Sequence, residues 1–394
     1  MKKQAILLVH GMGKHAAPTK EEPGAFTTEF LHATSAVLQK FPAHKNETLE
    51  DYFDLHEFNY DQRFDPIRAE MADRTKSMRE RMAALGDRHG IAFPADLASR
   101  LTAWESDFSK DRFFATHWLD VIFYGSPLGE KVRTDLALQI TALMGNYGIG
   151  NIHVIAHSLG TGIVHDTLHQ LFRPEDDPND LKPSDHRLGS VWMFANVSRL
   201  INSVTRLCDP LASVVKPDSA GCTKAFINVR HKLDPFTWLA TFDPQDNGSW
   251  VPGNIYAAHY SAIVTDLVRE ANPHSFTHYL SDPAVWTPLF DFLLEDNFQP
   301  SWSEIAQVAK ECADESHHGA SALLEGKFKG LTKGEIPPRW DDYLQTAKSL
   351  GQAVKQMEKL FPRSEAHAAP PPLHRLPRPP RFLPHRPRDR PSPL

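Results

Sequence analysis

The chain has 394 residues, 41% of them hydrophobic and 23% charged, a composition that excludes a disordered or fibrous protein and allows a large buried core. Its net charge of −6 at pH 7 excludes a general electrostatic attraction to nucleic acid. The three cysteines, Cys208, Cys222 and Cys312, are too widely spaced for a disulfide framework or a zinc site, so we expect a cytoplasmic protein in a reducing compartment.

The first predicted element is a buried strand at residues 5–9, which read AILLV. A short, continuous apolar run of this kind is typical of a strand that is covered on both faces. The run is too short for a signal peptide, and no stretch of the chain approaches the length of a transmembrane helix. The next residues, His10-Gly11-Met12-Gly13, form a loop whose glycines let the backbone come close to a ligand.

A helix at 22–39 and a strand at 52–60 are predicted next. Residues 65–119 are charged and rich in helical spacing, which indicates a helical insertion. Such an insertion can form a lid over an active site, but a surface helical hairpin explains the same pattern. The segments 120–124 and 132–144 then return the chain to the next strand.

The stretch 151–168, NIHVIAHSLGTGIVHDTL, combines a strand, a sharp turn and a helix. A serine at the apex of such a turn needs small residues two positions before and after it, because larger side chains collide across the bend. Around Ser158, Gly160 meets this requirement fully and Ala156 meets it with one methyl group. The pattern therefore predicts a nucleophile elbow, with the N-terminus of the following helix facing Ser158.

Further strands are predicted at 190–195, 224–229 and 261–269, and a helix at 286–294. Strands that alternate with helices indicate an α/β fold, in which a mostly parallel sheet has helices on both faces. We expect this domain to span residues 1–298.

Two segments follow that domain. Residues 299–363 are predicted to form a helical extension, and an apolar stripe at 340–361 is expected to pack on the domain, with a partner protein or a membrane surface as the alternative. Residues 364–394 are rich in proline and arginine and are expected to be a disordered tail, which could bind a protein partner.

A serine hydroxyl becomes a good nucleophile when a histidine accepts its proton, and that histidine needs a carboxylate to orient it. Asp234 is the preferred acid because it closely follows the strand that ends at Val229. Asp209 is the alternative, and Asp243 is a weaker third candidate.

Two histidines compete for the role of base, since His274 and His278 both lie between the last predicted strand and the last helix of the domain. His274 follows Asn272-Pro273 at the exit of a loop and is slightly preferred. His165 and His169 are spaced to share one face of a helix, but without a third ligand we interpret them as surface residues and predict no metal site.

Four motifs, in this order, carry a family resemblance: LLVHGMGKH, VIAHSLGTG, INVRHKLDPF and NPHSFTHYL. Over residues 4–295 the chain resembles the bacterial serine-esterase and lipase-like branch of the α/β-hydrolase superfamily. The resemblance implies an α/β-hydrolase-like fold and a triad of Ser158, Asp234 and His274 or His278. It also implies an oxyanion hole made by backbone N–H groups of Met12 (or Gly13) and Leu159.

The expected function is cleavage of a carboxylic ester, such as a lipid ester, through an acyl-enzyme and without metal or cofactor. Thioesterase, amidase and acyltransferase chemistry can use the same triad. A non-catalytic binding protein with this fold is the remaining alternative.

Overall fold

A computed structural model gives the structure of the protein and describes residues 4–12, 15–19, 22–89, 120–173, 181–183, 185–232, 234, 236–237, 240–244, 250–251, 253, 259–265 and 274–313. Four predicted segments lie outside the described residues: Gly13, the second half of the insertion (90–119), the extension from residue 314 with its apolar stripe at 340–361, and the tail at 364–394. The predictions made for them stay predictions.

A six-stranded, entirely parallel sheet forms the centre of the described chain, in the order β2-β1-β3-β4-β5-β6. This arrangement confirms the predicted α/β class. The strands are β1 (Gln4–Val9), β2 (Phe53–Phe58), β3 (Ile152–His157), β4 (Ser190–Phe194), β5 (Phe226–His231) and β6 (Tyr260–Thr265).

The apolar run in β1 has the burial that its sequence predicts, because alternate side chains enter two different cores. Leu7 and Val9 join the core on one face of the sheet, whereas Ile6 and Leu8 join the core on the other. Each face therefore needs a cover of helices, and strands such as β1 and β4 are continuous hydrophobic segments instead of alternating ones.

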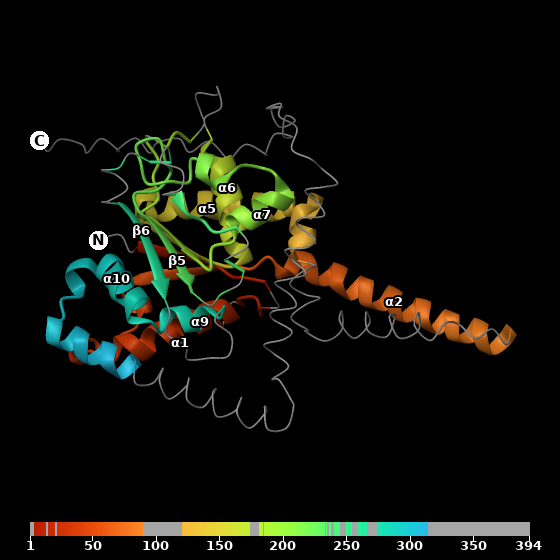
Figure 1. Cartoon of the computed structure of the whole chain (residues 1–394), viewed down its shortest axis with the longest axis horizontal. Coiled ribbons are helices and arrows are strands. Elements are labelled where there is room, and N and C mark those ends of the chain that lie inside the picture. Colours follow the sequence, from red (N-terminus) through yellow and green to blue (C-terminus); the bar gives the residue numbers. More distant parts are fainter. Residues whose placement is uncertain are drawn as a thin grey trace, which may run out of the picture. The chain divides into compact units, whose positions relative to one another are not determined.

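Helices cover both faces of the sheet (Figure 1). One face packs against α5 (Pro127–Tyr147), α6 (Leu159–Phe172) and α7 (Ser198–Thr205), and the other against α1 (Ala25–Leu38), α9 (Phe276–Leu280) and α10 (Pro283–Leu294). Short 3-10 helices lie at η1 (Pro42–His44), η2 (Leu49–Asp51), η3 (Ile149–Asn151), η4 (Pro210–Ala212) and η6 (Glu295–Asn297).

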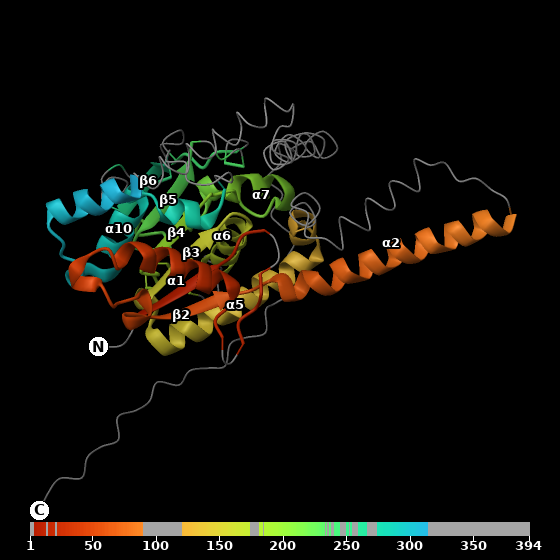
Figure 2. The same ribbon diagram turned by 90° about the horizontal axis from the view of Figure 1, so that it is seen from below.

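Helix α2 spans Asp61–His89 and leads from the body of the protein into the predicted insertion. Its first two turns belong to the body of the protein, where Phe64 and Arg68 are buried, and the following turns lead away from the sheet (Figure 2). The chain re-enters the described structure at Asp120, in a helical stretch at 120–125. None of the helices in the described ranges is both long and apolar enough to cross a lipid bilayer.

The predicted C-terminal extension begins with a helix at 302–313. Val308 and Cys312 of this helix are buried in the same core as α1 and α10. The described start of the extension is therefore packed on the sheet domain.

The strand order reverses direction between β1 and β3. The chain adds β2 on one side of β1 and then β3 on the other, so the connections after β1 and β3 run to opposite faces. In open parallel sheets, ligands bind outside the carboxyl ends of the strands at such a point. The loops that follow these two strands begin with His10 and Ser158.

Candidate active site

Ser158 occupies a strained turn between β3 and α6, with φ 52° and ψ −125°. A non-glycine residue in this conformation costs about 1–3 kcal/mol and persists only where its surroundings hold it. Here the Ser158 N–H donates to the carbonyl of Phe194 at 3.0 Å, and the Thr161 hydroxyl donates to the Ser158 carbonyl at 2.6 Å. The strain is thus located at the residue that the sequence singles out as nucleophile.

The small residues around the turn are required by close backbone contacts. A Cβ atom on Gly160 would lie 2.4 Å from the His10 carbonyl oxygen and 2.6 Å from that of Val9, so helix α6 begins directly against the end of β1. A Cβ atom on Gly11 would lie 2.9 Å from the Cβ of Ser158. The single methyl group of Ala156 is accommodated in the core.

Three side chains from separate segments form one hydrogen-bonded line. Nε2 of His274 lies 2.7 Å from the hydroxyl oxygen of Ser158, and Nδ1 of His274 lies 2.8 Å from Oδ2 of Asp234. All three residues are buried. The structure therefore brings together Ser158, Asp234 and His274, the preferred triad of the sequence analysis.

The partners of His274 determine where its proton lies. A carboxylate only accepts hydrogen bonds, so Nδ1 of His274 carries a hydrogen and donates it to Asp234. In the neutral ring Nε2 then has a free lone pair, which faces the hydroxyl hydrogen of Ser158. This is the tautomer that a general base for the serine requires.

The carboxylate of Asp234 is held in its charged form. Burial alone would raise the pKa of this carboxyl group, but the His274 ring and hydrogen bonds from Tyr279 and the Phe236 N–H outweigh burial and lower it. The Tyr279 hydroxyl donates to Oδ2 at 2.7 Å, and the Phe236 N–H donates to Oδ1 at 3.0 Å. Asp234 is thus charged at neutral pH and can stabilise a protonated His274.

Sequence reasoning missed two residues at this site. Tyr279 is fully buried, and its hydroxyl also accepts a hydrogen bond from the His231 N–H at 3.2 Å. His157 donates from Nε2 to the main-chain carbonyl of His274 at 2.8 Å, and burial lowers the pKa of His157 well below its usual value, so its ring is neutral. Both residues fix the segment that carries His274. The motifs NPHSFTHYL and VIAHSLGTG contained them, but no spacing rule assigned them a role.

The alternative residues have other surroundings. Asp209 caps η4, because its side chain accepts from the Leu211 N–H at 3.0 Å. His278 lies on α9, where its ring centroid is 4.9 Å from that of His231. The geometry therefore favours Asp234 and His274 over these alternatives.

The prediction that His165 and His169 are surface residues is wrong for His165, which is buried. Its Nδ1 lies 3.0 Å from Oδ1 of Asp166, and the Tyr124 hydroxyl donates to the other carboxylate oxygen at 2.9 Å. Helix α6 packs against both α5 and α7, and all but its last few residues are buried. Within the described ranges, no group of three or more His, Cys, Asp or Glu side chains is arranged to hold a metal ion.

The predicted oxyanion donors lie on the two loops that meet at Ser158. Leu159 is the first residue of α6, where N–H groups have no helical partner and the helix dipole favours negative charge. Gly11 precedes Met12 and approaches the Ser158 side chain closely, as the Cβ contact above indicates. Gly13 lies outside the described residues.

Access to Ser158 is restricted in this conformation. Ser158 is only 1% exposed and His274 only 4%. Two surface cavities, of about 380 and 270 Å³, are lined by residues of β4, β5, β6, α10 and the segment 298–305, and neither includes a residue of the triad.

No protein-family profile matches this chain, and no curated protein sequence matches it significantly. The function must therefore be inferred from the residues and their arrangement.

Proposed function

We propose that this protein is a serine hydrolase that cleaves carboxylic esters through an acyl-enzyme. The observation that carries the proposal is the line from the Ser158 hydroxyl through His274 to Asp234, with contacts of 2.7 and 2.8 Å. Core packing requires neither this line nor the strained backbone of Ser158. Nucleophilic acyl transfer requires both a reactive hydroxyl and an oriented base.

In the first half of the reaction, the Ser158 oxygen attacks the ester carbonyl carbon while Nε2 of His274 takes the hydroxyl proton. The negative charge that develops on the carbonyl oxygen is stabilised by N–H groups of Met12 and Leu159. The C–O bond to the alcohol then breaks, and His274 returns the proton to the leaving oxygen. The product is an acyl-Ser158 ester.

In the second half, a water molecule attacks the acyl-Ser158 carbonyl, with His274 again taking the proton. Collapse of the tetrahedral adduct releases the acid and returns the proton to Ser158. Asp234 keeps its charge throughout and stabilises the protonated ring.

The three free cysteines, two of them buried, agree with the proposed cytoplasmic location.

One observation favours a second candidate, a non-catalytic binding protein on the same fold. Ser158 is 1% exposed, and neither of the two cavities reaches it. If this burial always keeps substrates away from the Ser158 hydroxyl, the triad has only a structural role.

A fluorophosphonate probe decides between these candidates, because it labels a serine only when the hydroxyl is activated and reachable. We expect the wild-type protein to be labelled and Ser158→Ala not to be labelled. Folded wild-type protein that resists labelling at all probe concentrations would favour the binding protein. A panel of p-nitrophenyl esters, thioesters and anilides then separates esterase from thioesterase and amidase activity.

Variants of the two histidines test the assignment of the base. His274→Ala should lower turnover by at least about 10³-fold, because the serine loses its proton acceptor. His278→Ala is the matched control, four residues further on, and should retain most of the activity. The reverse ranking would move the base to His278.

A further inference from the structure

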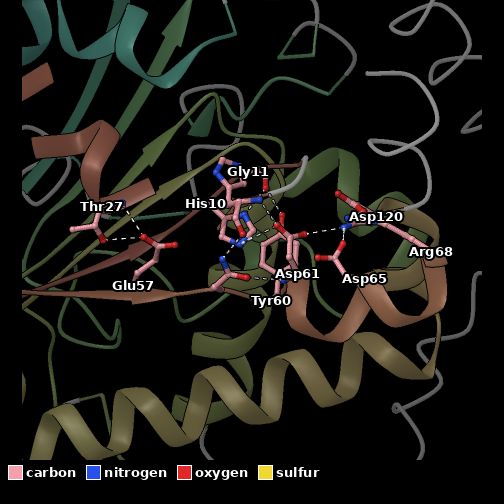
Figure 3. A network of polar contacts seen from close by, with 11 residues as sticks. His10, Gly11, Thr27, Glu57, Tyr60, Asp61, Asp65, Arg68 and Asp120 are labelled. Atoms are coloured by element: carbon pink, nitrogen blue, oxygen red, sulfur yellow. Dashed lines mark hydrogen bonds and ion pairs between the residues drawn. The ribbon is translucent and has the colours of Figure 1, made fainter. Parts of the chain in front are cut away.

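A buried tyrosine from another part of the chain contacts the loop that follows β1. Tyr60 lies between β2 and α2, is fully buried, and stacks its ring on that of His10 with 4.1 Å between the ring centroids. The Tyr60 hydroxyl donates to the main-chain carbonyl of Gly11 at 2.5 Å (Figure 3). This contact joins the segment before the insertion to the loop beside the nucleophile.

The same carbonyl has a second donor. Nδ1 of His10 lies 2.7 Å from the Gly11 oxygen, and a carbonyl only accepts, so this nitrogen carries the hydrogen. Burial lowers the pKa of His10 to about 4, which keeps the ring neutral at pH 7. The Gly11 carbonyl is therefore held by two donors, both of them buried.

A carbonyl fixed in this way also fixes the N–H group of the next residue. In a trans peptide the C=O and N–H bonds point in opposite directions, and no peptide in the described ranges is cis. The Gly11 oxygen points toward Tyr60 and His10, so the N–H of Met12 points to the opposite side of the same peptide plane. Gly11 itself lies against Ser158.

The segment that carries Tyr60 is fastened in turn by a buried ionic cluster, which we define as Asp61, Arg68 and Asp120. Arg68 donates to Asp61 at 3.2 Å and also pairs with Asp120, which lies where the chain returns from the insertion (Figure 3). Asp61 also accepts from the His15 N–H at 2.7 Å. The cluster thus links both ends of the insertion to the loop at 10–15.

Burying three charged groups is a costly way to obtain packing alone, since apolar residues of similar volume often stabilise a protein equally well. Charged and hydroxyl groups form directional hydrogen bonds, and these bonds fix the orientation of the groups that they contact. Tyr60 directly precedes Asp61 of this cluster, and its hydroxyl orients the peptide group between Gly11 and Met12.

We propose that Tyr60 is a positioning residue for the oxyanion hole: its hydroxyl holds the Gly11 carbonyl so that the Met12 N–H faces the substrate oxygen. This inference rests on the proposed function. Tyr60 does not touch the substrate, and it acts through the Gly11–Met12 peptide. Its loss should therefore weaken binding of the transition state and leave binding of the substrate unchanged.

The test is Tyr60→Phe, assayed with p-nitrophenyl butyrate and with active sites counted by fluorophosphonate titration. We expect kcat per active site to fall about tenfold or more with little change in KM, since loss of a direct oxyanion donor costs about 10²–10³-fold and His10 still holds the carbonyl. An alkyl trifluoromethyl ketone, which forms a tetrahedral adduct with the serine, should bind more weakly by a similar factor. The matched methyl ketone, which stays trigonal, should bind equally well.

Tyr147→Phe is the matched control. It removes a hydroxyl that donates to Asp54 at 2.9 Å at the edge of the sheet, and it should leave kcat and both inhibitors unchanged. The inference is overturned if Tyr60→Phe keeps kcat within about twofold, if it weakens both ketones equally, or if Tyr147→Phe has the same effect. A wild-type protein without turnover, or turnover that survives Ser158→Ala, instead removes the proposed function and this inference with it.

Discussion

Tyr279 shows how one oxygen atom can serve two purposes at the residue scale. Oδ2 of Asp234 accepts from both the His274 ring and the Tyr279 hydroxyl, so the tyrosine fixes the carboxylate without displacing the histidine. The same hydroxyl satisfies the His231 N–H at the end of β5. A phenylalanine at this position would fill the space but provide neither contact.

We predict that Tyr279→Phe lowers kcat/KM by about tenfold and the free energy of unfolding by about 1–3 kcal/mol, because the His231 N–H loses its partner. The pKa of Asp234 should rise, since one of the hydrogen bonds that lower it is gone. Steady-state kinetics and urea unfolding measure the two effects. Tyr52→Phe, which removes a hydroxyl from Glu47 near the surface, is the control and should not affect kcat/KM. Unchanged kinetics in Tyr279→Phe would contradict the prediction.

That Ser158 and Asp234 would lie close together was predictable because motifs constrain both residues. Ser158 lies in a turn that tolerates only small neighbours, and Asp234 follows a strand, as the chemistry requires. The choice between His274 and His278 was not predictable, since it depends on how α9 is rotated against the sheet. Tyr279 and Tyr60 were missed for a related reason, as their roles depend on which atoms meet across the fold.

At the scale of elements, the close contact between α6 and β1 predicts that a larger residue at position 160 destabilises the protein. Gly160→Ala places a Cβ atom within 2.6 Å of two main-chain carbonyl oxygens, and neither β1 nor α6 can yield without moving Ser158. We expect a loss of about 1–3 kcal/mol in the free energy of unfolding and a disproportionate loss of fluorophosphonate labelling.

Gly150→Ala is the matched control, because its added Cβ atom meets first the end of the flexible Lys224 side chain. It should change stability little and labelling not at all. Equal labelling of the Gly160→Ala and Gly150→Ala proteins would show that the start of α6 does not position the nucleophile.

The strands β1 and β4 were predictable as elements because each is a short apolar run between breaks, and both lie within a residue of their predicted bounds. The sequence pattern predicted the helical segment as a whole but not the residue at which its first helix begins. Helix α2 begins at Asp61, and an ion pair between Asp61 and Arg68 joins its first two turns.

At the scale of the whole molecule, buried neutral histidines make stability depend on pH. Burial lowers the pKa of His10, His153 and His169 to about 4 in each case, and it lowers the pKa of His157 well below its usual value. An unfolded chain binds these protons near pH 6.5, so between pH 6.5 and 4 the unfolded state holds more protons than the folded state. Protonation in this range therefore favours unfolding.

We predict that the free energy of unfolding is greatest above pH 6.5 and falls as the pH drops toward 4, by up to about 1.4 kcal/mol per pH unit for each histidine. Burial raises the pKa of Glu57 and Asp61, and these carboxyl groups act in the opposite direction. Urea titrations at pH 7, 5.5 and 4.5 measure the balance. A midpoint that stays constant over this range would mean that the histidines do not control acid stability.

The pairing of Arg68 with Asp120 also bears on how this chain can diverge. The polypeptide leaves the body just after Arg68 and returns at Asp120, and these two side chains touch. The distance that the intervening residues must span is therefore set by the body, and each doubling in length of a flexible connection costs only about 0.6 kcal/mol. The contact between Arg68 and Asp120 thus allows this whole excursion to be exchanged for one of another size while the body of the protein stays the same.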